Sequence, residues 1–192
     1  MICYLHGFRS SPRSFKARVV HAHMAAIGRA DQLICPQLPA SPRAAMALVL
    51  TLTERYKPHE LAFVGSSLGG FYATWLAERL GCRAALLNPA VAPFQDLAQY
   101  VGTSTEYHTD KPFEFKQEYI GELGELAVPA ITRPERYYLL AATGDEVLDY
   151  RSMVAHYAGA TQHVIEGGDH AIGDFETYVD EVLAFCLADC AQ

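Results

Sequence analysis

Short, almost uninterrupted apolar runs alternate with helix-like segments along most of this chain. The apolar runs predict strands over residues 2–5, 31–35, 61–64, 83–87, 136–142 and 162–165. Helical spacing, with punctuation by serine, proline and glycine, predicts helices over residues 13–27, 41–56, 71–80, 150–157 and 175–186. Strands that are apolar along their whole length are typical of a parallel sheet covered on both faces. We therefore expect an α/β fold, with a parallel sheet of about six strands and helices on both faces.

The alternation stops between residues 90 and 132, in a segment that is rich in aromatic and charged residues. We interpret this segment as a small cap inserted into a single domain that spans residues 1–192. A length of 192 residues is typical of one domain with one core. In open α/β sheets, ligands bind beyond the carboxyl ends of the strands. We therefore expect the functional residues in the loops that follow the predicted strands.

Composition and charge limit the kinds of partner. Hydrophobic residues make up 51% of the chain and charged residues 19%, as in globular proteins, and the net charge is −7. Nucleic acid binds clustered Lys and Arg, so this charge argues against such a partner. The five cysteines form no C-x-x-C pair, which predicts neither a disulfide framework nor a zinc site and favours the reducing cytoplasm. We expect no signal peptide and no membrane partner, because no apolar run is long enough to span a bilayer, and the oligomeric state stays open.

One glycine-rich stretch joins a predicted strand to a predicted helix. Residues 65–69 read G-S-S-L-G, which matches G-x-S-x-G with Ser67 at its centre and Ser66 as a flanking residue. Glycines two positions before and after the serine let strand and helix approach closely, and they leave Ser67 at the apex of a sharp turn. A plain glycine turn and a phosphate loop are the alternatives, but the chain has neither G-x-G-x-x-G nor the P-loop lysine. We interpret Ser67 as a nucleophile.

A serine nucleophile needs a base, and the chain order for this motif is serine, acid, histidine. Alone among the four later histidines, His170 lies in a glycine-flanked loop after the last predicted strand. Asp145 comes directly after the preceding strand and is the expected acid. Asp149 is the alternative, but it lies where the next helix begins, and an acidic residue is ordinary there as an N-cap. We predict a triad of Ser67, Asp145 and His170.

Acyl transfer also needs N–H donors for the developing oxyanion. We expect the main-chain N–H groups of Leu68, next to the nucleophile, and of Phe8, in the loop after the first strand, to supply them. Phe113 and Phe115 in the cap either line an acyl pocket or pack the cap. We expect no cofactor and no metal, since the chain has no H-E-x-x-H motif or carboxylate cluster and a serine mechanism needs none.

Several blocks of the sequence are similar to those of the YqiA-like esterases of the α/β-hydrolase superfamily. The blocks are YLHGFRSSPRSFKA, FVGSSLGGFYATWLAE, TGDEVLDYR and EGGDHA, and the match covers nearly the whole chain. The resemblance implies a compact α/β-hydrolase fold that lacks the first strands of the full fold. It also implies esterase activity with Ser67, Asp145 and His170 as the triad.

The sequence thus predicts a serine esterase that hydrolyses carboxylic esters of small molecules through an acyl-enzyme. An acyl thioesterase is the alternative within the enzyme class, with Lys111 and Lys116 meeting the phosphates of a carrier. A non-catalytic binding protein is a third hypothesis, because a fold does not determine a function. Ester and thioester kinetics, together with labelling by a serine-directed phosphonate, distinguish the three.

Overall fold

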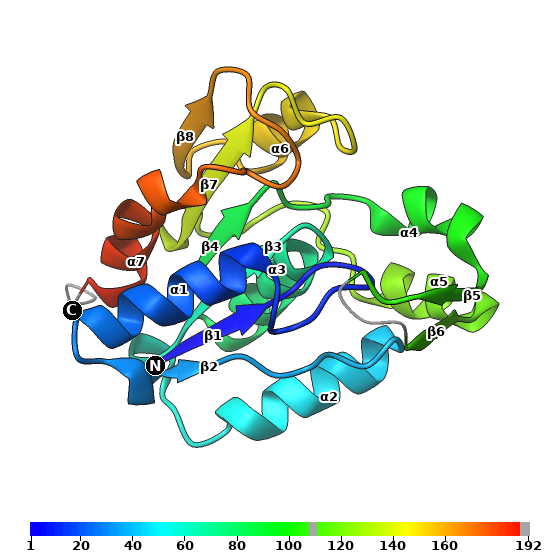
Figure 1. The fold of residues 1–192 in the computed structure, drawn as a ribbon, viewed down its shortest axis with the longest axis horizontal. Coiled ribbons are helices and arrows are strands. Elements are labelled where there is room, and N and C mark those ends of the chain that lie inside the picture. Colours follow the sequence, from blue (N-terminus) through cyan, green and yellow to red (C-terminus); the bar gives the residue numbers. More distant parts are fainter. Residues whose placement is uncertain (108–110, 189–192) are drawn as a thin grey trace.

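The computed structural model describes residues 1–107 and 111–188, and its centre is a six-stranded sheet (Figure 1). The strands are β1 (Ile2–Leu5), β2 (Leu33–Ile34), β3 (Ala62–Ser66), β4 (Arg83–Leu87), β7 (Tyr137–Ala142) and β8 (Thr161–Ile165). They lie in the order β2-β1-β3-β4-β7-β8, and all neighbouring pairs are parallel. Almost every residue of the four central strands is buried, which explains their continuous apolar sequences. The predicted parallel sheet is confirmed.

Helices cover both faces of this sheet (Figure 1). One face carries α1 (Phe15–Ala26) and α7 (Val179–Leu187), and the other carries α2 (Pro42–Thr53), α3 (Leu68–Leu80) and α6 (Tyr150–His156). Phe63 and Val64 are neighbours in β3 and belong to the two different cores, because successive strand residues point to opposite faces. None of the helices in the described residues is both long and apolar enough to cross a membrane.

Several element boundaries differ from the prediction by a few residues, and three of these differences change the elements near the sheet edge or the chain ends. The second strand has only two residues, because a 3-10 turn, η1 (Ala30–Gln32), occupies the start of the predicted run. Helix α3 begins at Leu68 instead of residue 71, so the serine turn leads directly into the helix. The closing helix is divided into a 3-10 turn, η5 (Phe175–Thr177), and α7. Short 3-10 turns also occur at η2 (Pro58–Glu60) and η4 (Pro134–Arg136).

The segment between β4 and β7, residues 88–136, is here called the insertion. It contains α4 (Pro93–Asp96), the 3-10 turn η3 (Leu97–Tyr100), an antiparallel hairpin of β5 (Gly102–Thr105) and β6 (Pro112–Phe115), and α5 (Gln117–Glu125). Residues 108–110 of the predicted cap lie outside the described residues. Phe115 and Leu123 belong to the same core cluster as α2 and α3, and Glu122 accepts a hydrogen bond of 2.7 Å from Ser41 Oγ. The insertion therefore packs on the main core.

The loops that carry the candidate residues leave the sheet at one edge. The register pairs Leu5 with Gly65, Ser66 with Leu87, and Ala142 with Ile165, so the last residues of β1, β3, β4, β7 and β8 lie at similar heights. Parallel strands end at the same side of the sheet, and this alignment brings loops that are distant in sequence close together.

Candidate active site

Ser67 lies at the turn between β3 and α3, in a main-chain conformation that is uncommon for residues other than glycine. Its φ is 54° and its ψ is −121°. Such a conformation costs on the order of 1–3 kcal/mol and persists where surrounding contacts impose it. Ser67 N–H donates to Leu87 O at 3.0 Å, while Ser67 O accepts from Gly70 N–H at 2.8 Å and Ala90 N–H at 3.1 Å. These bonds hold the turn that presents the Ser67 side chain at the sheet edge.

The two glycines of the motif allow this turn to form. A Cβ on Gly65 would overlap the main chain of Gly69, and a Cβ on Gly69 would overlap the main chain of Leu5. The first overlap is the strand-to-helix approach that the motif predicts. The second overlap shows that the start of α3 also lies against β1, because β1 is the neighbour of β3 in the sheet.

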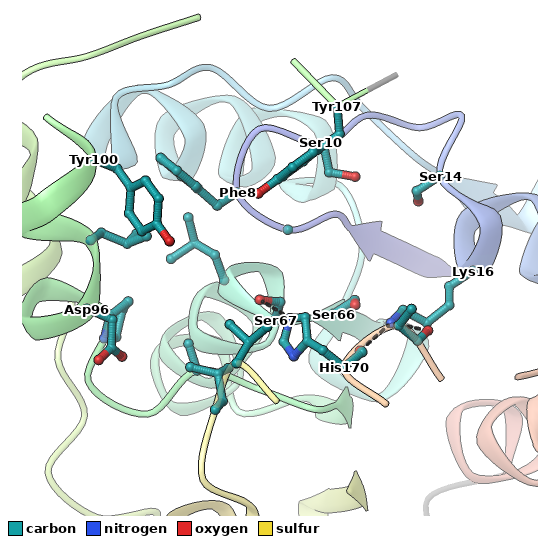
Figure 2. Close-up of a pocket in the computed structure, with 18 of the residues that line it drawn as sticks. Phe8, Ser10, Ser14, Lys16, Ser66, Ser67, Asp96, Tyr100, Tyr107 and His170 are labelled. Atoms are coloured by element: carbon teal, nitrogen blue, oxygen red, sulfur yellow. Dashed lines mark hydrogen bonds between the residues drawn. The ribbon is translucent and has the colours of Figure 1, made fainter. Parts of the chain in front are cut away.

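His170 lies between Ser67 and Asp145. His170 Nε2 is 3.0 Å from Ser67 Oγ (Figure 2), and His170 Nδ1 is 2.7 Å from Asp145 Oδ2. A carboxylate accepts hydrogen bonds, so the proton is on Nδ1, and Nε2 is left to accept the Ser67 proton. The structure thus brings together the three residues that the sequence singles out, in the geometry that a nucleophile, a base and an orienting acid require.

Asp145 and Asp149 occupy different environments. Asp145 has a fully buried side chain, and its Oδ1 accepts from the Val147 and Leu148 N–H groups, each at 2.8 Å. Burial acts to raise the pKa of Asp145, but the hydrogen bonds from His170 and these N–H groups outweigh it, so the pKa lies below its ordinary value. Asp149 instead accepts from Arg151 N–H at 3.0 Å and caps α6.

The two expected oxyanion donors lie beside the serine. Leu68 is the first residue of α3, and the loop after β1 approaches so closely that a Cβ on Gly7 would be 3.3 Å from Ser67 Cβ. Within the described residues, neither Phe8 N–H nor Leu68 N–H donates a hydrogen bond to the protein. An oxyanion donor needs such an N–H group, so this arrangement is consistent with the expected role.

His6 supports the loop that carries Phe8. The His6 side chain is buried, its Nε2 accepts from Leu38 N–H at 3.0 Å, and its Nδ1 donates to Gly7 O at 3.0 Å. Burial lowers the pKa of His6, against a smaller opposite effect of the bond to Gly7. Both ring nitrogens of His6 therefore bind the main chain, and His6 has a structural role in this loop.

A cavity of about 440 Å³ opens at Ser67, within the 300–1,000 Å³ common for small-molecule sites. Its apolar wall comes from the loop after β1, the insertion and the loop after β7, through Phe8, Pro93, Leu97, Tyr100 and Leu148. Its polar lining includes Ser10, Ser14 and Lys16, and also Asp96 and Gln99 of the insertion. Figure 2 shows Tyr100 on one side of Ser67 and Lys16 on the other, so the cavity extends to both sides of the serine.

Phe113 and Phe115 lie behind this cavity. Phe115 is 1% exposed and Phe113 is partly buried, and among the described residues that line the cavity neither is found. Both rings pack edge-on against Phe8, with centroid separations of 5.2 and 5.0 Å. Both rings therefore support Phe8 at the back of the cavity, and a direct contact of either ring with an acyl group stays a prediction.

Two further residues at the site escape sequence reasoning, namely Lys16 and Asn88. Lys16 Nζ donates to Ala171 O at 2.7 Å and to His170 O at 3.3 Å, and Asn88 Nδ2 donates to His170 O at 3.2 Å. Asn88 follows β4 just as Ser67 follows β3, and that position at the sheet edge is the signal that could have found it. A helical lysine gives no such signal, because most lysines are exposed.

In residues 1–107 and 111–188, no group of three His, Cys, Asp or Glu side chains is arranged to hold a metal ion.

Comparisons with known proteins agree with this architecture. A family model described as "Uncharacterised protein family (UPF0227)" matches residues 1–187. Est1E from Butyrivibrio proteoclasticus with bound ferulic acid is 14% identical, with a TM-score of 0.70 over 100% of this chain and 89% of that chain. A structure from a study of the metagenome-derived lipolytic enzymes LipS and LipT is 18% identical, with a TM-score of 0.69 over 96% of this chain and 92% of that chain. Mouse alpha/beta hydrolase domain-containing protein 10 is 20% identical, with a TM-score of 0.65 over 95% of this chain and 88% of that chain. These likenesses confirm the predicted α/β-hydrolase fold.

Proposed function

We propose that this chain, which belongs to the UPF0227 family of YqiA-like proteins, is a serine esterase that hydrolyses carboxylic esters through Ser67. One observation carries the proposal, namely the continuous chain of hydrogen bonds from Asp145 through His170 to Ser67. The His170 ring is 2.7 Å from Asp145 and 3.0 Å from Ser67, and Ser67 lies in a strained turn at the mouth of the cavity. This combination supports nucleophilic catalysis more strongly than the motif does alone.

In the proposed reaction, Ser67 Oγ attacks the ester carbonyl while His170 Nε2 takes the hydroxyl proton. The Phe8 and Leu68 N–H groups donate hydrogen bonds to the resulting oxyanion. Asp145 stabilises the imidazolium, which then gives its proton to the departing alcohol and leaves an acyl-enzyme. His170 next takes a proton from water, the hydroxide attacks the acyl group, and the carboxylic acid departs as Ser67 regains its proton.

The shape of the cavity supports a small-molecule ester. Apolar residues of the insertion, Leu97 and Tyr100, suit an acyl or aryl group. Polar lining residues on both sides, Asp96 and Lys16, suit the more hydrated parts of the substrate. We infer that the acyl group lies against Phe8, Leu97 and Tyr100.

The experiment compares Ser67→Ala with Ser66→Ala on 4-nitrophenyl esters and acyl thioesters of increasing chain length. Loss of a triad nucleophile costs about a million-fold in kcat, so Ser67→Ala should be inactive while Ser66→Ala retains most of its rate. A fluorophosphonate should label wild type at Ser67, located by mass spectrometry. A preference for thioesters would identify a thioesterase, and a wild type that neither turns over nor reacts would refute the proposal in favour of a binding protein.

A further inference from the structure

The main chain around His170 is held by side chains from three other parts of the fold. His170 lies in the loop between β8 and η5, outside regular secondary structure. Its N–H donates to Glu146 Oε2 at 3.0 Å, and its carbonyl accepts from Asn88 Nδ2 at 3.2 Å and from Lys16 Nζ at 3.3 Å. The position of the base therefore depends on residues far from it in sequence.

Asn88 makes one of these attachments from a fully buried position at the end of β4. Its Oδ1 accepts from Ala142 N–H, at the end of β7, at 2.8 Å. Its Nδ2 donates to Asp169 O at 3.0 Å and to His170 O at 3.2 Å. An amide supplies the acceptor and the donors at once, so these partners determine its orientation. Asn88 thus connects the sheet to the loop of the base.

Lys16 makes the second attachment, from the first turn of α1. The residue is 8% exposed, and Nζ donates to Ala171 O at 2.7 Å and to His170 O at 3.3 Å. Figure 2 shows its side chain reaching the loop that carries His170. Together, Asn88 and Lys16 bind the carbonyls of three successive residues, 169, 170 and 171.

We propose that Asn88 and Lys16 are positioning residues that hold the main chain of residues 169–171, so that the His170 ring stays aligned between Asp145 and Ser67. The inference rests on the proposed serine mechanism. The Ser67 contact is 3.0 Å long, and displacement of the loop by about 1 Å would take it beyond hydrogen-bond reach. Asn88 is fully buried, so it acts through His170 and not on the substrate.

The principal test is Asn88→Asp, which keeps the shape and the acceptor for Ala142 N–H but removes the donors to the loop. We expect kcat for 4-nitrophenyl acetate to fall by about a hundred-fold with little change in KM, because misplacement by about 1 Å costs about that much. Gln162→Glu is the matched control. Gln162 Nε2 also donates to two main-chain carbonyls, Val154 O at 3.1 Å and Tyr157 O at 2.8 Å, but neither belongs to the loop of His170. The control should lower the thermal midpoint and leave kcat unchanged.

A second readout does not depend on activity. Asn88 is the only asparagine in the chain, so selective 15N-asparagine labelling gives side-chain signals from one NH2 group, a pair that shares one 15N shift. We expect slow hydrogen exchange of this amide in wild type and faster exchange in Lys16→Met, because both side chains hold the same carbonyl of His170. Lys16→Met should also lower kcat.

The proposal is overturned if Asn88→Asp keeps the wild-type kcat while losing as much stability as Gln162→Glu. If Asn88→Asp does not fold, Lys16→Met is the test. An unchanged kcat and slow exchange of the Asn88 amide in Lys16→Met would refute the proposal that the two side chains position His170 together. Failure of the proposed function would give a different result, because wild type itself would then hydrolyse no ester. Amide exchange at Asn88 would still show whether Asn88 and Lys16 fix the main chain of residues 169–171.

Discussion

Asp145 and Asp149 show how position decides the role of one residue type. Both carboxylates follow β7 and both accept main-chain N–H groups, but only Asp145 also reaches a histidine. Asp145 can therefore maintain the tautomer that leaves Nε2 free, whereas Asp149 satisfies N–H groups at the start of α6. The two positions therefore predict different effects of the same substitution on the catalytic rate.

Asp145→Asn should lower kcat by about ten thousand-fold with little change in the thermal midpoint, because the amide favours the wrong histidine tautomer. Asp149→Asn should keep most of the rate and change the unfolding free energy little, because asparagine caps a helix about as well as aspartate. Steady-state kinetics and thermal melts on both variants check this. A rate loss in Asp149→Asn alone would move the acid to Asp149.

The buried ammonium of Lys16 predicts a dependence of stability on pH. Burial lowers the pKa of Lys16 from 10.5 to about 8, although the nearby carboxylates of Asp169 and Asp145 act to raise it. Between these two pH values the unfolded chain keeps a proton that the folded chain has lost, so the contribution of Lys16 to stability rises with pH. Below about pH 8 both states are protonated and the contribution is constant.

Urea unfolding of wild type and Lys16→Met at pH 7, 9 and 10.5 measures this contribution of Lys16. The effects of other titrating groups cancel when the unfolding free energies of the two proteins are subtracted. The difference should move in favour of wild type by about 3 kcal/mol over this range. A difference that is independent of pH would mean that Lys16 keeps its ordinary pKa in the folded protein.

At the scale of elements, the insertion is joined to the loop that carries the Phe8 N–H group. Arg9 Nε donates to Thr105 O at 2.7 Å, and Tyr107 N–H donates to Arg9 O at 2.8 Å. The Phe8 ring packs against Phe115 from β6, as well as against other aromatic rings of the insertion. The insertion therefore supports the loop of the proposed oxyanion donor, in addition to lining the cavity.

Substitutions in the insertion should separate these two roles. Tyr100 lines the cavity and is exposed at its mouth, so Tyr100→Ala should change chain-length preference and leave turnover of an acetate ester nearly intact. Phe115 is buried behind Phe8, so Phe115→Ala should cost about 3–5 kcal/mol of stability and lower the rates on all esters alike. Equal effects of the two variants across an ester series would show that the insertion has one role only.

At the scale of the whole molecule, the insertion shares a hydrophobic core with the sheet. Phe115 and Leu123 pack in the cluster that also contains Leu76 of α3 and Met46 of α2. Parts that share a core lose stability together, so we expect residues 1–192 to unfold as one cooperative unit. Calorimetric and van't Hoff enthalpies of unfolding should agree. Two separate transitions, with the insertion melting first, would show that it is a unit of its own.

Local patterns in the sequence determined much of this protein. Apolar runs and helical spacing predict the six strands and the main helices, because these elements arise from periodicity over a few residues. The turn at Ser67 follows from the spacing of Gly65 and Gly69, which is local sterics. Asp145 and His170 could be located because parallel strands end at one edge, so positions after successive strands meet.

Only the tertiary structure decided the rest. The strand order, the place of Phe115 behind Phe8, and the contacts of Asn88 and Lys16 with His170 all join residues far apart in the chain. No local pattern separates a lysine that binds carbonyls from one that faces water, because that choice depends on how α1 packs beside the loop after β8. The sequence thus determines which residues carry the proposed chemistry, and long-range packing decides what holds them in place.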